Sequence, residues 1–154
     1  MLKWEEEEWL LDIALDNLSL GRAWLLQSRQ LSDGDYRQAS EFLQRALDGL
    51  RQAGQLDVLP LGLLARAELR RVTGDYQRAR TDLDEAQRIA ERSQMGLHLA
   101  DCHLERARLC LALGDRDTAR KAWETAKAMI ERMGYHRRDG EVAEIEARLN
   151  ADEG

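Results

Sequence analysis

Apolar residues recur along this chain at the spacing of one helical face, and the same pattern occurs three times at a fixed interval. An alanine is followed four residues later by a large apolar residue and three residues after that by a second alanine. These positions share one side of an α-helix. The pattern therefore predicts helices whose alanines allow close approach while the larger residue fills the remaining gap. The three copies are Ala39, Leu43 and Ala46; Ala79, Leu83 and Ala86; and Ala119, Trp123 and Ala126.

A glycine and an aspartate stand before each copy of this pattern. The three pairs are Gly34 and Asp35, Gly74 and Asp75, and Gly114 and Asp115. Glycine readily takes the left-handed conformation that closes a helix, and aspartate accepts hydrogen bonds from the free N–H groups that begin the next one. Each unit is therefore predicted to be a helix, a tight turn and a second helix. A fixed period of about 40 residues is typical of a solenoid of stacked units.

These boundaries predict an all-α solenoid of seven to eight helices that fills residues 1–154 as one domain. The expected helices are 3–15, then the pairs 18–32 and 36–53, 58–72 and 76–93, and 97–112 and 116–133, and finally 140–150. The repeats are assigned to 17–56, 57–96 and 97–136, with a partial or capping helix at 1–15 and a C-terminal capping helix at 139–150. Because the end segments match only half of a unit, we interpret the chain as an excised fragment or as a unit whose end helices serve as caps.

Composition supports helices and argues against a sheet. Charged residues make up 34% of the chain, Pro60 is its single proline, and Val and Ile are scarce beside Leu, Ala, Arg and Glu. Straight-chain residues lose less rotamer freedom in a helix than β-branched residues do.

The net charge of −6 is spread unevenly. Residues 1–20 and residues 139–154 each carry −5, which leaves a mildly basic centre. A nucleic-acid-binding protein would normally show a stronger basic stripe, so we do not expect nucleic acid as a partner. The chain has neither a signal peptide nor an apolar run of the length that crosses a membrane, which predicts a cytoplasmic protein that does not enter membranes.

Candidate catalytic chemistry is sparse. The helical spacing of Cys102 and Cys110 puts them about 12 Å apart along the axis, too far for a disulfide with each other. His98 and Cys102 share a helical face, but a structural zinc site needs four ligands, so ordinary packing is favoured. His136 is interpreted as a turn or capping residue, or as part of a basic patch with Arg137 and Arg138. No phosphate loop, H-E-x-x-H pattern or nucleophile elbow occurs, so we expect no enzyme, metal or cofactor.

The pattern G-D-[YR]-x-x-A-x-x-x-[LW]-x-x-A resembles the second-helix signature of the tetratricopeptide repeat (TPR) over about residues 17–134. The units depart from the common form because they are longer, at about 40 residues, and because they place Arg70 or Cys110 at aromatic positions. Such longer units resemble the C-terminal repeats of bacterial signal-transduction (STAND) NTPases of the NACHT and NB-ARC type. The resemblance implies a right-handed superhelix and a non-enzymatic arm that recognises or senses a protein or peptide. The NTPase module itself is absent from the sequence, because nothing matches G-x-x-x-x-G-K-[ST].

In the TPR family the first helices line a concave groove. By register, the groove positions fall on Trp24, Leu64, Glu68, Arg71, Asp101 and Arg108. Such a groove would suit an extended or helical peptide of mixed charge. The alternative is that Trp24 lies in the core and the charged residues are solvated bystanders. The pair Glu105 and Arg108, three residues apart, is expected to belong to such a solvated face.

The acidic N-terminal segment allows two interpretations. Trp4, Leu11 and Leu15 share one helical stripe, and Trp9 and Ile13 share another. In the first interpretation Trp4 and Trp9 both pack on the first repeat. In the second, one of them stays exposed at the solenoid end and joins two molecules. The alternative function is therefore a structural or engineered repeat scaffold that forms homo-oligomers through its ends.

Overall fold

The computed structural model describes residues 2–151, and the side chains of residues 5–151. Within these residues the chain is all α-helical, as predicted. The helices are α1 (Leu2–Gln30), α2 (Arg37–Gln52), α3 (Leu59–Val72), α4 (Tyr76–Arg92), α5 (Gly96–Ala112), α6 (Arg116–Met133) and α7 (Asp139–Ala151), with a short 3₁₀ helix, η1 (His136–Arg138), before α7.

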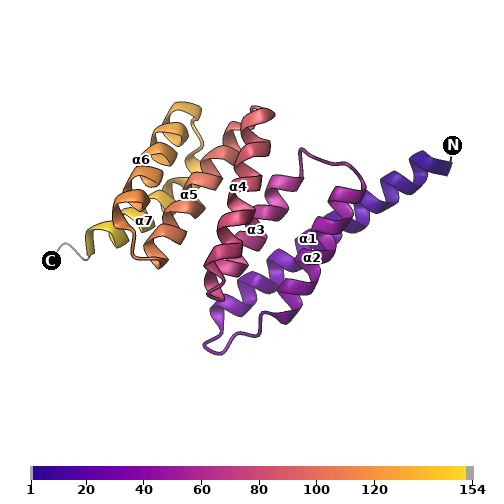
Figure 1. Ribbon diagram of the computed structural model, residues 1–154, viewed down its shortest axis with the longest axis horizontal. Coiled ribbons are helices and arrows are strands. Elements are labelled where there is room, and N and C mark those ends of the chain that lie inside the picture. The colour runs from indigo at the N-terminus through magenta and orange to yellow at the C-terminus, as the bar shows by residue number, and fades with distance from the viewer. Residues whose placement is uncertain (1, 152–154) are drawn as a thin grey trace.

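The helices pack as sequential hairpins. α1 lies along α2, α3 along α4, and α5 along α6, and the hairpins follow one another in a row (Figure 1). α7 packs against α6 and α5 at the C-terminal end. This TPR-like arrangement confirms the predicted helical-hairpin solenoid.

The alanine pattern forms the inner face of each second helix. Ala39, Leu43 and Ala46 of α2 are fully buried, and the equivalent residues of α4 and α6 are buried as well. In α6 the large residue is Trp123, whose Nε1–H donates a 2.9 Å hydrogen bond to the carbonyl oxygen of Val142 in α7. The close-packing role predicted for this pattern is therefore confirmed, and Trp123 also ties the last helix to the stack.

Glycine closes the first helix of the second and third hairpins as predicted. Gly74 has φ 85° and Gly114 has φ 78°, both in the left-handed region. Gly34 is not among the glycines with a positive φ. A Cβ at this position would collide with the carbonyl oxygen of Ser28. The glycine of the first turn is therefore required by close backbone approach.

The aspartates that follow these glycines bind the N-terminal ends of the second helices. Asp115 accepts a 3.1 Å hydrogen bond from the backbone N–H of Thr118, and Asp75 accepts a longer one from Arg78. This satisfies donors that have no partner inside the helix. The predicted capping role is confirmed at these two turns.

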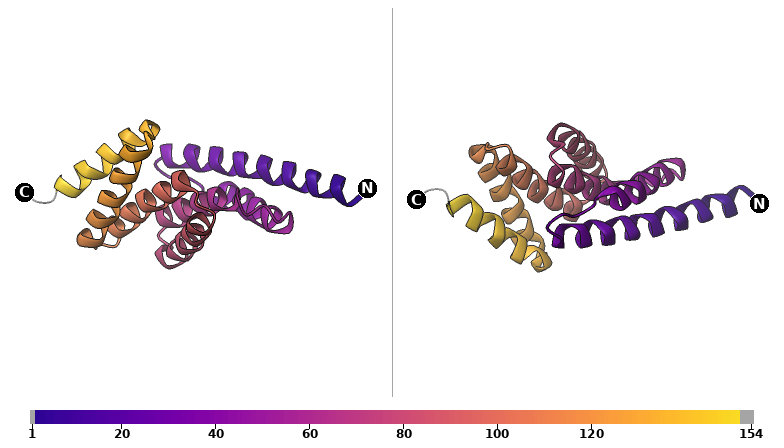
Figure 2. Two further views of the ribbon diagram at one scale, coloured as in Figure 1. Left: turned by 90° about the horizontal axis from the view of Figure 1, so that it is seen from above. Right: turned by 90° about the horizontal axis from the view of Figure 1, so that it is seen from below.

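One predicted boundary is wrong. The sequence pattern predicts separate helices at 3–15 and 18–32, but α1 runs without a break from Leu2 to Gln30. The connecting residues include no proline or glycine, and the buried stripe of Ala14, Leu18 and Leu25 continues across them. The N-terminal part of α1 consequently projects beyond α2 (Figure 2). Although α1 has 29 residues, no helix between residues 2 and 151 is long and apolar enough to cross a membrane.

Candidate functional site

A groove runs along the first helices of the hairpins. Residues of α1, α3 and α5, together with η1 and the start of α7, enclose about 520 Å³. Its apolar part is made by Ala23 and Leu26 of α1 and by Leu61 and Leu64 of α3. Leu26 is 59% exposed, so this part of the groove offers accessible apolar surface.

The polar part of the groove is built on a continuous chain of ion pairs. Positive and negative side chains alternate along it, and each contacts the next. Its members, in order, are Arg71, Glu105, Arg108, Glu141, Arg138 and Asp101. With three members of each sign, the chain is electrically neutral, and it joins α3, α5 and α7.

Glu105 is the buried member at the α3–α5 junction. Its Oε1 accepts a 2.5 Å hydrogen bond from Nε of Arg71, and its Oε2 accepts a 3.3 Å bond from Arg108. Burial raises the pKa of the Glu105 carboxyl, and the two guanidinium groups oppose this shift. Glu105 is only 5% exposed, so the expectation that it forms a solvated pair with Arg108 is wrong.

Glu141 and Arg138 continue the chain to the C-terminal helix. Glu141 accepts hydrogen bonds of 2.7 Å from Arg108 and 2.6 Å from Arg138. Burial acts to raise the pKa of Glu141, but the two guanidinium groups outweigh it and the pKa is lowered. Arg138 also binds both carboxylate oxygens of Asp101, at 2.8 and 3.0 Å, and its guanidinium lies 5.5 Å from the ring centre of Tyr135.

These contacts decide between the two interpretations of the segment before α7. Arg138 is neutralised by Asp101 and Glu141 and does not contribute to a free basic patch. His136 lies in η1 with its Nδ1 3.1 Å from Oδ2 of Asp139, which is the position of a turn residue.

Most of the residues that the register assigned to the groove lie there. Leu64, Glu68, Asp101 and Arg108 line it, and Glu68 is ion-paired with Arg29. Arg71 is connected to it through Glu105.

Trp24 is the exception among these assignments. It is 36% exposed and is not among the residues that line the groove. The adjacent residue, Leu25, is buried and takes that place. A one-residue step turns a helix by about 100°, which accounts for the different direction of Trp24.

Sequence reasoning missed three members of the chain of ion pairs: Glu105, Arg138 and Glu141. A signal for them was present, because Glu105 and Arg108, and likewise Arg138 and Glu141, are opposite charges three residues apart. Spacing alone does not distinguish a buried pair from a solvated one. What distinguishes them is the packing of α7 against α5, which follows from the tertiary fold.

The side chains of the groove are suited to contact rather than to reaction. Its carboxylates are engaged by arginine side chains. Among the described residues no group of three or more His, Cys, Asp and Glu side chains could hold a metal ion. Cys102 and Cys110 are both free and buried. The arrangement can hold a ligand by shape, by apolar contact and by oriented charge.

A separate exposed apolar region lies on the N-terminal part of α1. Trp9 is 72% exposed and forms a shallow hollow with Leu10, Ile13, Glu5 and Glu6. Trp9 therefore does not pack on the first repeat. The side chain of Trp4, which was assigned to the same region, lies outside the described residues.

The comparisons with known proteins give one family. The model of the family described as anaphase-promoting complex subunit 5 matches residues 25–104, which is just over half of the chain. The match begins near the end of α1, includes α2, α3 and α4, and ends within α5. Neither the curated proteins nor the solved structures gave a match. The chain thus belongs to the family of anaphase-promoting complex subunit 5.

Proposed function

We propose that this chain is a non-enzymatic protein-interaction module that holds a segment of a partner protein in the groove along α1, α3 and α5. The observation that carries the proposal is an accessible apolar row, made by Ala23, Leu26, Leu61 and Leu64, beside a rigid and charge-balanced floor. The family takes its name from a subunit of a multiprotein complex, and this supports a role in assembly.

The groove indicates what kind of segment would bind. Its carboxylates are already paired with guanidiniums, so a partner gains little by adding a single positive charge. Burial of apolar side chains against Leu26 and Leu61 would supply most of the affinity, at roughly 25 cal/mol per Å². Polar groups of the partner would then fix its register. An extended or helical peptide of mixed charge with at least one large apolar residue meets these requirements.

Site-specific photo-crosslinking in the native cells tests this proposal. A photoreactive amino acid at position 26 should crosslink to a defined protein, identified by mass spectrometry. The matched control is the same amino acid at position 113, because Leu113 is also exposed but lies outside the groove. Equal crosslinking to the same proteins from both positions would count against the groove.

The narrower function, a recognition arm of a bacterial signalling or defence NTPase, rests on the resemblance of the longer repeats to the C-terminal repeats of such NTPases. The family match adds nothing in its favour. It predicts that the chain purifies from its native cells with an ATP- or GTP-hydrolysing protein, and that Leu26→Asp changes the hydrolysis rate of that protein.

The alternative is self-association through the solenoid ends, and the exposure of Trp9 favours it. It predicts that light scattering behind a sizing column gives a mass of two or more chains that falls on dilution. Replacing Trp4 and Trp9 with Gln should then yield a monomer near 17.7 kDa. A constant mass near this value over a hundredfold concentration range would exclude this alternative.

A further inference from the structure

α1 carries a second unpartnered face. Besides Leu26 in the groove, four of its large apolar residues are exposed: Trp9 by 72%, Ile13 by 52%, Leu20 by 46% and Trp24 by 36%. Their spacings of four, seven and four residues place them within an arc of about 60° along about 22 Å of helix. They form one continuous apolar stripe and not a scatter of isolated residues.

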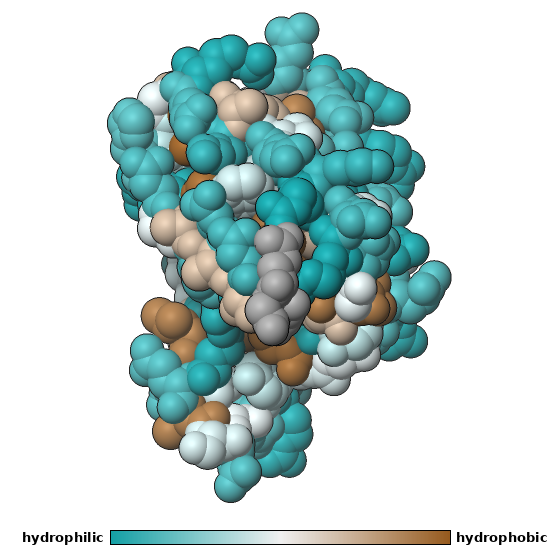
Figure 3. All heavy atoms as spheres, turned by 90° about the vertical axis from the view of Figure 1, so that its left-hand side faces the viewer, coloured by the Kyte–Doolittle hydropathy of each residue, from teal (hydrophilic) through white to brown (hydrophobic). Residues whose placement is uncertain are grey.

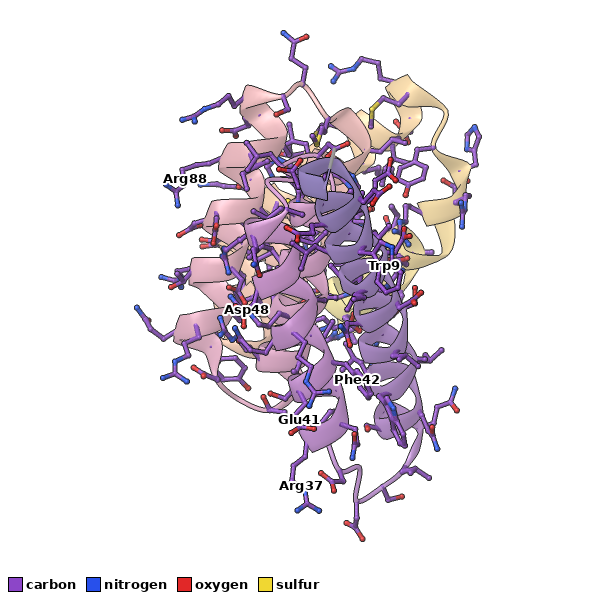
Figure 4. The ribbon with its side chains drawn as sticks, turned by 90° about the vertical axis from the view of Figure 1, so that its right-hand side faces the viewer. Trp9, Arg37, Glu41, Phe42, Asp48 and Arg88 are labelled. Carbon is purple, nitrogen blue, oxygen red and sulfur yellow. The ribbon has the colours of Figure 1, made fainter. Side chains whose placement is uncertain are left out.

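This stripe lies at the N-terminal end of the solenoid. The buried residues Ala14, Leu18 and Leu25 occupy another side of α1, where α2 and α3 cover them. The four stripe residues do not line the groove. Figure 4 looks onto this end, where α1 and α2 are nearest the viewer and Trp9 and Phe42 are labelled.

The opposite end of the molecule does not share this character. α7 turns its large apolar residues, Val142, Ile145 and Leu149, inward. Figure 3 shows this end, where hydrophilic residues cover most of the face and hydrophobic residues appear only in scattered patches. An extended apolar stripe thus distinguishes the N-terminal end of the stack.

Negative charge accompanies the N-terminal half of the stripe. Residues 5–20 contain six carboxylates and no lysine or arginine. All six are exposed. They are Glu5, Glu6, Glu7, Glu8, Asp12 and Asp16. A surface that joins apolar area to one sign of charge selects partners by charge complementarity.

We propose that this end face, defined as Trp9, Ile13, Leu20 and Trp24, docks a basic amphipathic helix of another protein. The apolar side of that helix would cover the stripe, and its lysine or arginine residues would reach the carboxylates beside it. A helix of about 15 residues matches the length of the stripe. A second copy of this chain fits less well, because its end face carries the same negative charge and no lysine or arginine to complement it. Nucleic acids and anionic membranes would be repelled for the same reason.

Synthetic peptides test this proposal on the full chain. The probe is an 18-residue helix with leucines at the stripe spacing and lysines on both flanks. One control has the same composition in an order that gives no apolar face, and the other carries glutamate in place of lysine. Fluorescence anisotropy should show binding of the probe that weakens as salt is raised, and both controls should bind at least tenfold more weakly.

Protein variants locate the binding. Ile13→Gln combined with Leu20→Gln should weaken binding of the probe at least tenfold. Leu97→Gln combined with Leu113→Gln is the matched control, since these leucines are 48% and 43% exposed away from the end face, and it should leave binding unchanged. Circular dichroism confirms that each variant is folded.

Three results would overturn the proposal. These are equal binding of the scrambled peptide, equal loss of binding in the control variant, and a dimer whose dissociation is required before the probe binds. The variant Leu26→Asp distinguishes binding at the end face from binding in the groove. It changes only the groove, so it should leave binding of the probe unchanged, whether or not the groove has a partner.

Discussion

Gln94 occupies a backbone conformation that the other repeats give to glycine. Its φ is 54°, whereas Gly54 and Gly134, at the equivalent positions of the neighbouring repeats, both have φ 67°. Among residues 2–151 it is the only non-glycine residue with a positive φ. A side chain in this region brings Cβ close to the neighbouring carbonyl, at a cost of about 1–2 kcal/mol.

We therefore expect Gln94→Gly to raise the free energy of unfolding by about 1 kcal/mol, measured by urea denaturation. Gln94→Ala retains the Cβ and should give no comparable gain. Equal stability of the Gln94→Gly variant and the parent chain would show that the turn at Gln94 is not strained.

The two cysteines should be almost unreactive in the folded chain. Cys102 is fully buried, and burial raises the pKa of its thiol to about 12. Burial also raises the pKa of Cys110. Because the thiolate is the reactive form, modification by a thiol reagent at pH 8 should be slow and should accelerate at higher pH. Denaturant should release two reactive thiols per chain, and rapid modification of either one without denaturant would contradict the burial.

At the scale of single residues, the sequence predicted which side chains allow close packing better than it predicted where a side chain points. The alanine positions were predictable because only small residues permit close helix packing. The direction of Trp24 was not, since it depends on which side of α1 faces the groove, and Leu25 takes that place. The turn after α1 was not predictable either, because it is held by a 2.7 Å hydrogen bond that Ser28 Oγ donates to the carbonyl oxygen of Asp35. This contact and the close approach at Gly34 involve residues that no local pattern links.

At the scale of helices, the buried carboxylate of Glu105 should matter more than its exposed counterparts. We expect Glu105→Ala to destabilise the fold by about 3–5 kcal/mol, because it leaves the Arg71 and Arg108 guanidiniums without their buried partner. Thermal or urea unfolding measures this difference.

The chain offers a matched control in the pair of Arg51 and Glu85. This pair also spans 34 residues and has a 2.9 Å contact, but its side chains are 39% and 30% exposed. Glu85→Ala should cost less than about 1 kcal/mol. Similar losses in Glu105→Ala and Glu85→Ala would mean that burial does not decide the strength of these links.

Helix boundaries were predictable wherever glycine and aspartate mark a turn. They were not predictable between residues 15 and 18, where the change of repeat register suggested a break. A helix ends where its backbone groups find other partners or where its buried face stops. At Asn17 neither condition holds, because α1 continues to present Leu18 and Leu25 to its neighbours.

At the scale of the whole molecule, the free energy needed to open α1 locally should rise from its N-terminal end toward residues 18–25. Glu5, Glu6, Glu7, Glu8 and Trp9 are all exposed, whereas Leu18 and Leu25 are buried in the first hairpin. Local opening requires little free energy where few apolar contacts are lost. Hydrogen exchange followed by mass spectrometry should therefore show fast exchange in the first ten residues and strong protection around residues 18–25. Uniform protection along α1 in a monomeric sample would contradict this gradient.

The unbroken course of α1 has a mechanical consequence. Trp9 at the end face and Leu26 in the groove lie on the same helix, about 25 Å apart along its axis. No flexible joint separates them, since the helix passes through the expected break without interruption. A force that tilts the projecting end would therefore be transmitted to the groove wall through the buried contacts of Ala14, Leu18 and Leu25 with α2 and α3.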